Sequence, residues 1–146
     1  MADLYALEFV GGPDGTVMPP KKLDGRLVSA KKRRTRAAKP LTILNVGDRL
    51  YIGKLPQDAV LQALTVNTDT SFGTTTLSIG TTAVPNKYVN GKTVTTTDQP
   101  TAIGPTAAAA RNGPVTADED LWMTIGAAAI PAAVLATFYM EYTIAN

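Results

Sequence analysis

Residues 48–82, DRLYIGKLPQDAVLQALTVNTDTSFGTTTLSIGTT, decide the fold of this chain. Apolar and polar residues alternate from Val60 to Asn67 and again from Thr74 to Ile79, which is the period of a β-strand with one buried face. The connection between them, residues 67–73 (NTDTSFG), is rich in residues that tolerate tight turns. An earlier run, residues 49–54, ends before Pro56, which cannot donate to a central ladder. The pattern predicts three strands, with the second and third as antiparallel neighbours.

Two motifs frame this stretch, residues 47–56 (GDRLYIGKLP) and residues 76–80 (TLSIG). They resemble segments of capsid decoration (cement) proteins and minor head proteins of tailed phages. The resemblance implies a β-sandwich of jelly-roll type and a structural role in a phage head. It also implies assembly into a homo-trimer.

The C-terminal part of the chain predicts two more strands. One runs from Leu121 to Ile125 and the other from Val134 to Ile144, where six apolar residues alternate onto one face. Such a face must meet a second layer, because burying each large side chain contributes on the order of 1.5 to 3 kcal/mol. With turn residues about every ten positions, the chain as a whole predicts an all-β, antiparallel sandwich of jelly-roll type.

Three weaker local signals complete the predicted secondary structure. Residues 41–44 (LTIL) predict the start of a strand, and Asn90-Gly91 predicts a β-hairpin, since both residues accept the positive φ of a type I′ turn. Pro105 could open a short helix that Gly113 closes. Residues 95–120 form a long connection, and a connection of this length is usually functional or ordered by a contact, here expected between subunits.

Composition excludes several classes of function. The chain has 146 residues, enough for one domain, and contains Cys 0 and His 0. It therefore has no disulfide framework, no thiolate nucleophile, no Cys/His zinc site and no imidazole base. No signal peptide or membrane span is expected, because the first residues lack a positive run and the longest apolar run is short and holds Gly and Pro. We expect a soluble, non-catalytic protein without a cofactor or metal.

Charge divides the chain into two unequal parts. Residues 1–39 carry a net charge of +5 and the remainder −3. We therefore predict two regions, an extended basic N-terminal arm (1–40, basic from residue 21) and the β-sandwich domain (41–146). Within the arm, residues 2–10 alternate weakly, with Tyr5, Leu7 and Phe9 on one side. They could form an edge strand, or an arm that becomes a strand only against a partner.

The basic run within the arm holds the candidate site residues. We predict that these residues dock the protein onto a partner: Lys31, Lys32, Arg33, Arg34 and Arg36. Arg and Lys could pair with carboxylates of neighbouring capsid subunits, or with phosphates in a sequence-independent, salt-sensitive manner. A solvated charged tail is the third interpretation. No aromatic residue interrupts the run, which argues against single-stranded nucleic acid.

Other candidate sites have simpler explanations. Asp118-Glu119-Asp120 lacks the companion spacing of a calcium loop, and both it and the Asn67/Asp69 pair match polar turns. Trp122 could be a platform for a sugar or a partner, but its neighbours Leu121 and Met123 favour packing.

The sequence thus predicts a non-enzymatic virion protein on the capsid surface, assembled in the host cytoplasm, with the major capsid protein as partner and itself as a trimer. Two alternatives remain at this stage. A minor head or connector protein would turn the basic arm towards packaged DNA. A head spike would bind host glycans through an exposed Trp122 or Tyr139 surface.

Overall fold

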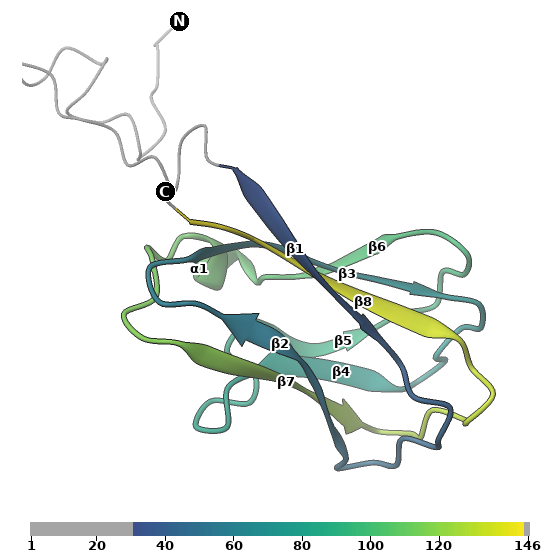
Figure 1. Cartoon of the computed structure of the whole chain (residues 1–146). Helices are drawn as coiled ribbons and strands as arrows, with labels where there is room; N and C mark the ends of the chain where they lie inside the picture. Colours follow the sequence, from purple (N-terminus) through teal and green to yellow (C-terminus); the bar gives the residue numbers. More distant parts are fainter. Residues whose placement is uncertain (1–30, 145–146) are drawn as a thin grey trace, which may run out of the picture.

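A computed structural model describes residues 31–144, and the fold is a sandwich of two four-stranded antiparallel sheets (Figure 1). The only helix in this range is one short turn. The elements in chain order are β1 Lys32–Ala38, β2 Arg49–Leu55, β3 Val60–Thr68, β4 Thr76–Gly80, β5 Val89–Thr93, β6 Thr101–Gly104, α1 Ala107–Ala110, β7 Glu119–Gly126 and β8 Ala136–Thr143.

The strand order identifies the sandwich as a jelly roll. One sheet has the order β1-β8-β3-β6 and the other β2-β7-β4-β5. Except between β4 and β5, each step along the chain moves to the other sheet, so the strands wrap around a single core. The all-β, antiparallel jelly-roll prediction is confirmed.

The core lies between the two sheets and uses the faces that the alternation predicted. Leu121, Met123 and Ile125 of β7 are buried, as are Phe138 and Met140 of β8. The remaining apolar residues of the last strand behave similarly, with Val134 and Ala136 buried and Tyr142 and Ile144 packed against the core at its margin. These two strands are central in their sheets, which explains why their patterns are the clearest in the sequence.

The prediction that the strands before and after residues 67–73 are neighbours is wrong. β3 pairs with β8 and β6, whereas β4 lies in the other sheet between β7 and β5. The connection crosses from one sheet to the other because Phe72 is buried in the core and its N–H donates to the Val94 carbonyl at 2.9 Å. A buried aromatic residue in the middle of the polar run therefore decides against a tight hairpin.

The predicted hairpin at Asn90-Gly91 is also wrong. These residues lie inside β5, where Gly91 has φ +60° and the register between β4 and β5 shifts. The Gly91 N–H donates to the Ser78 hydroxyl oxygen at 3.0 Å. The positive φ that favours glycine is present, but it serves a β-bulge, and the true β4–β5 connection is residues 81–88.

Residues 41–44 do not form the predicted strand. Leu44 makes one isolated bridge with Ile130, while Leu41 and Ile43 are 71% and 52% exposed. The short helix between Pro105 and Gly113 is confirmed as α1, which Thr106 caps by accepting a hydrogen bond from the Ala109 N–H.

Candidate functional site

The predicted docking residues lie on β1, an edge strand of the β1-β8-β3-β6 sheet. β1 pairs with β8 along its whole length, from Lys32 opposite Thr143 to Ala38 opposite Thr137. The alternation of the strand puts Lys32, Arg34 and Arg36 on the outer face of the sandwich and turns Thr35 and Ala37 towards the core. Residues 32–38, which the sequence assigned to the arm, thus belong to the sheet. Residues 1–30 of the predicted arm lie outside the described residues.

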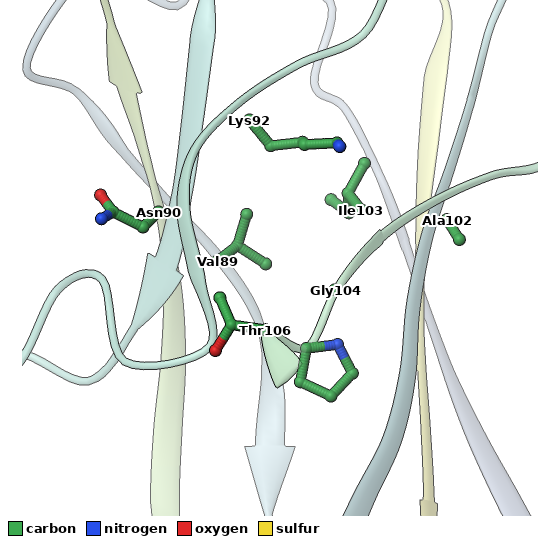
Figure 2. A pocket seen from close by; sticks show the side chains of 8 residues that line it. Val89, Asn90, Lys92, Ala102, Ile103, Gly104 and Thr106 are labelled. Atoms are coloured by element: carbon green, nitrogen blue, oxygen red, sulfur yellow. The ribbon is translucent and has the colours of Figure 1, made fainter. Parts of the chain in front are cut away.

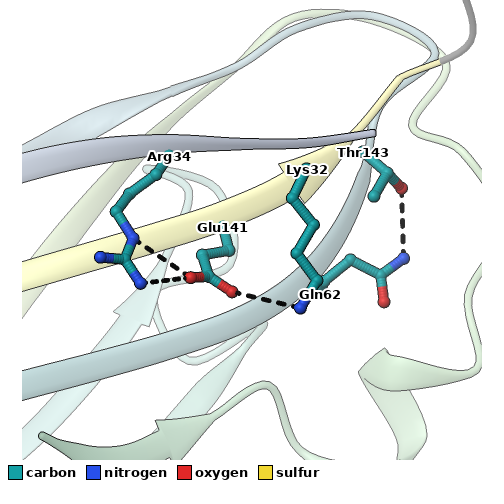
Figure 3. Close-up of polar contacts among 5 residues, drawn as sticks. All are labelled: Lys32, Arg34, Gln62, Glu141 and Thr143. Atoms are coloured by element: carbon teal, nitrogen blue, oxygen red, sulfur yellow. Dashed lines mark hydrogen bonds and ion pairs between the residues drawn. The ribbon is translucent and has the colours of Figure 1, made fainter. Parts of the chain in front are cut away.

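One carboxylate sits among these cations (Figure 3). The Arg34 Nε and Nη2 atoms both donate to Glu141 Oε1, at 3.1 and 2.5 Å, and the Lys32 Nζ lies 3.9 Å from Oε2. The Arg34 guanidinium also lies over the Tyr139 ring, 4.9 Å from its centroid. The Lys32 and Arg34 side chains remain 70% and 57% exposed, so these ion pairs contribute no more than about 1 kcal/mol each. They orient the cations without removing them from solvent.

The other three predicted site residues are exposed as well. Among residues 31–144, no hydrogen bond or ion pair is found for the side chains of Lys31 and Arg36. Arg33 points to the other side of the strand and lines a hollow of about 170 Å³ with Pro56, Tyr142 and Ile144. Among residues 31–144, we give the name basic edge to these five cations together with the carboxylate that contacts them from β8: Lys31, Lys32, Arg33, Arg34, Arg36 and Glu141.

A sixth cation of the same run, Lys39, has a different role. It is buried, and its Nζ donates to the carbonyls of Pro40, Thr42 and Ala132 at 3.0, 3.1 and 3.4 Å. Removal from water lowers the pKa of the Lys39 ammonium below its ordinary value. Sequence reasoning placed Lys39 with the solvated cations. The only sequence signal for its burial is the apolar run that follows it.

Lys39 holds together an end of the sandwich that exposes large apolar side chains. Residues 40–46 and 127–135 lie side by side there, joined by the Leu44–Ile130 bridge and by the contacts of the Lys39 ammonium, at the end away from residues 31 and 144 (Figure 1). Neither segment contains a charged residue. The side chains that it exposes are Leu41 71%, Ile43 52%, Val46 57% and Leu135 59%. We call this surface the apolar tip.

The acidic triplet 118–120 anchors loops and the second sheet. Asp118 accepts a hydrogen bond from the Gln57 N–H at 2.7 Å, Glu119 contacts the Lys87 ammonium and the Tyr88 hydroxyl, and Asp120 accepts from the Tyr51 hydroxyl at 3.0 Å. Within residues 31–144, no three side chains of the types His, Cys, Asp or Glu gather as a metal site requires. Each acid of the triplet thus has a structural partner.

Trp122 lies on the outer face of the β2-β7-β4-β5 sheet and is half-buried by its neighbours. The Tyr51 ring is 5.1 Å from it, centroid to centroid, and the Arg49 guanidinium lies 4.5 Å from the ring centre. Tyr139, the other aromatic residue of the glycan hypothesis, lies under Arg34. Both rings therefore have a cation in contact with one face.

The connection 95–120 contains β6 and α1. With β5 it encloses a groove of about 360 Å³, shown in Figure 2. No helix among residues 31–144 is long and apolar enough to cross a bilayer.

Comparison with known proteins shows a shared fold. No family model matches the chain, and no curated protein matches its sequence. Solved structures with a similar fold include three phage capsids. They are the cyanophage Pam1 capsid asymmetric unit (TM-score 0.55, 17% identity), the capsid of Ralstonia phage GP4 (0.58, 16%) and the acidic stable capsid of Helicobacter pylori bacteriophage KHP30 (0.52, 13%).

These matches extend over most of the chain. The first two cover 80% of this chain and 85% of the matched chain, and the third covers 77% and 87%. At such identities the likeness establishes the jelly-roll architecture. It does not assign a role to any individual residue.

Proposed function

We propose that this chain is a non-enzymatic structural protein of a phage virion, and that it binds and stabilises the capsid shell from outside as a decoration (cement) protein. The major capsid protein is its partner, and assembly takes place in the host cytoplasm. The similarity in fold to chains in three phage capsid structures supports a place in the virion. The basic edge is the observation that carries the docking role.

The geometry of the basic edge suits a protein surface with clustered carboxylates. Lys32, Arg34 and Arg36 stand on alternate positions of one strand, so they are about 6.6 Å apart along a straight row. β8 backs this strand along its whole length, so these side chains start from fixed backbone positions. Arginine can add paired hydrogen bonds to the two oxygens of a carboxylate. Arg34 already donates two hydrogen bonds to one oxygen of Glu141.

Selective binding of the assembled shell is enough to stabilise that shell. A protein that binds the assembled shell better than the free subunits shifts the equilibrium towards the shell by mass action. The edge position adds a second benefit, because charges on an edge strand oppose aggregation with other sheets. Neutralising the cations tests docking and leaves the fold intact, since they are exposed.

The apolar tip supports the further proposal that the protein is a homo-oligomer, with the trimer as the expected state. An exposed surface with four large apolar residues is typical of an interface, although the carboxylates of Asp48 and Asp69 lie at its margin. Replacing Leu41 and Ile43 by Ser should lower the oligomer mass in sedimentation equilibrium. Val84→Ser is the matched control, because Val84 is 47% exposed in another loop. An unchanged mass in the double variant would exclude the tip as the contact between copies.

Co-sedimentation with capsids of the phage that encodes this chain tests the docking proposal. The variant Lys32→Gln/Arg36→Gln should bind at least tenfold more weakly than wild type, about 1.4 kcal/mol. Lys54→Gln/Arg111→Gln removes the same charge from two other exposed positions and should bind like wild type. Equal losses in both variants would show a dependence on net charge alone and would reject the basic edge.

The same variants distinguish the DNA alternative. If the protein fails to pellet with capsids but binds duplex DNA, and if Lys32→Gln/Arg36→Gln lowers the salt dependence of that binding, then the basic edge faces packaged DNA. The expected change in slope is roughly 0.9 for each phosphate contact that is lost.

A further inference from the structure

The groove between β5 and β6 is a second surface that the docking role does not use (Figure 2). It has a volume of about 360 Å³ and a mixed lining. Val89 and Ile103 are buried side chains at its floor, and Pro105 adds a third apolar wall. Lys92 is the only charged residue among those that line the groove.

The groove is closed at one end and open at the other. Near Gly104 the two strands approach so closely that a Cβ atom there would lie 2.6 Å from Val89 Cγ2 and 3.1 Å from the Tyr88 carbonyl oxygen. The Thr106 N–H donates to the same carbonyl at 2.8 Å. Lys92 and Ala102 line the groove further along the two strands. The absence of a side chain at position 104 thus allows the two strands to close this end of the groove. The other end, near Lys92 and Ala102, stays open.

Both walls of the groove are sheet edges. Within residues 31–144, β5 pairs only with β4, and β6 pairs only with β3. Edge strands offer backbone N–H and C=O groups to an added strand, and pockets between them accept alternate side chains. The site therefore fits an extended peptide with apolar residues at every second position.

The chain itself contains such a peptide in residues 4–10 (LYALEFV). Tyr5, Leu7 and Phe9 fall on one side of the alternation, which matches the apolar floor. Glu8 falls on the other side, towards the rim, where its negative charge complements Lys92. The sequence pattern and the charge of residues 4–10 thus both match the lining of the groove.

The length of the intervening chain allows this contact. Residues 11–30 comprise 20 residues, which can span up to about 66 Å at roughly 3.3 Å per residue. β1 and β6 are the two edges of one four-stranded sheet, so they are only about 14 Å apart. Residues 4–10 can therefore reach the groove of their own copy or of a neighbouring copy.

We propose that residues 4–10 bind as an extended strand in the β5–β6 groove, with Leu7 over Val89 and Ile103 and Glu8 beside Lys92. The contact closes an open edge of the sandwich and fills the groove with apolar side chains. It does not depend on the capsid role, because no residue of the basic edge takes part.

Cysteine cross-linking of the full chain tests this placement, since the native sequence contains no cysteine. Under mild oxidation, Glu8→Cys/Lys92→Cys should form a disulfide at least tenfold faster than the control Glu8→Cys/Lys54→Cys, whose second position is exposed on β2. A cross-linked band at monomer mass assigns the segment to its own copy, and a dimer band assigns it to a neighbour. Equal rates in the two variants would overturn the proposal.

Hydrogen exchange gives a second test without any cross-link. The variant Leu7→Asp should release the segment and speed exchange of the backbone amides of residues 89–93 and 101–104 at least tenfold. Ala6→Asp, on the opposite side of the same segment, should leave these amides near the wild-type rate. Exchange that is the same in both variants would contradict the contact. Neither assay contains capsids, so the result is separate from the test of docking.

Discussion

Replacing Lys39 by Met distinguishes this structural cation from the proposed docking cations. Lys39 and Arg36 lie three positions apart in the same basic run, yet one is buried and the other is exposed. Three backbone carbonyls accept hydrogen bonds from the Lys39 ammonium, and all three belong to the segments of the apolar tip. The effect on folding should therefore differ sharply between the two sites.

The loss of folding free energy in Lys39→Met is the balance of two opposing contributions. A hydrogen bond from a charged donor contributes about 1.5 to 3 kcal/mol, and three such bonds are lost in Lys39→Met. Burial of the charge costs several kcal/mol, which the variant no longer bears, and Met keeps the packing of the apolar stem. We expect a net loss of about 2 kcal/mol, against no more than about 0.5 kcal/mol for Arg36→Met.

Urea unfolding measures this difference. For a domain of this size, a loss of about 2 kcal/mol lowers the midpoint by about 1 M. Because burial lowers the pKa of Lys39 in the folded state, the unfolded chain binds more protons at this site as pH rises towards 10.5. The stability difference between wild type and Lys39→Met should therefore grow with pH in that range. Equal midpoints for Lys39→Met and Arg36→Met, or a difference that shrinks with pH, would refute this reasoning.

Three further predictions test the interior of the sandwich. Burial, then the hydrogen bond to Glu119 and its charge, raise the pKa of the Tyr88 hydroxyl above its ordinary value of 10.0, so this group's contribution to stability is complete below pH 10 and is lost as pH rises beyond it. Thermal unfolding should show a smaller fall above pH 10 in Tyr88→Phe than in wild type, and parallel curves would contradict the assignment. A Cβ at Gly80 would lie 2.1 Å from the Val84 carbonyl oxygen and 2.7 Å from the Lys87 nitrogen, whereas one at Gly113 meets nothing within 4 Å. By urea unfolding, Gly80→Ala should cost more than about 2 kcal/mol and Gly113→Ala less than about 0.5 kcal/mol, and similar costs would show that the loop adjusts. Leu121 is 0% exposed and Leu41 is 71% exposed, so Leu121→Ala should cost about 3 kcal/mol and Leu41→Ala almost nothing in the monomer. A small loss for Leu121→Ala would mean that this part of the core collapses around the cavity.

Alternation of apolar residues was enough to predict the fold class and the central strands. It works for β7 and β8 because both are central strands, and the opposite sheet covers one face of each along most of its length. It fails for residues 41–44, where Leu41 and Ile43 face solvent at the apolar tip and only Leu44 is buried. Exposed apolar residues in a loop can thus imitate the pattern of a core strand.

Sheet partners could not be predicted from local turn signals. The Asn-Gly pair in β5 has the backbone conformation that the sequence suggested, but a bulge uses it instead of a hairpin. The polar run before β4 contains Phe72, and burial of its ring directs the chain across the sandwich. Such choices depend on contacts between residues that are distant in sequence.

The proposed docking residues were chosen from charge alone, and their place on an edge strand was not predicted. High charge density suggested an extended arm, whereas an edge strand can carry cations on its outer face and still bury Ala37 and Thr35 in part. Lys39 was missed because its partners are backbone carbonyls, which leave no trace in a sequence. The β5–β6 groove was missed for a related reason, since the edges of two different sheets form it only in the folded sandwich.

Cryo-electron microscopy of the decorated capsid tests the central claim most directly. We predict density for the jelly roll on the outer surface of the shell, with Lys32 and Arg36 facing carboxylates of the major capsid protein. Capsids incubated with Lys32→Gln/Arg36→Gln, at a protein concentration at which wild type occupies most sites, should show much weaker density at these positions. Density on the inner surface, with β1 turned towards DNA, or an outer position in which β1 faces solvent, would contradict the proposed docking.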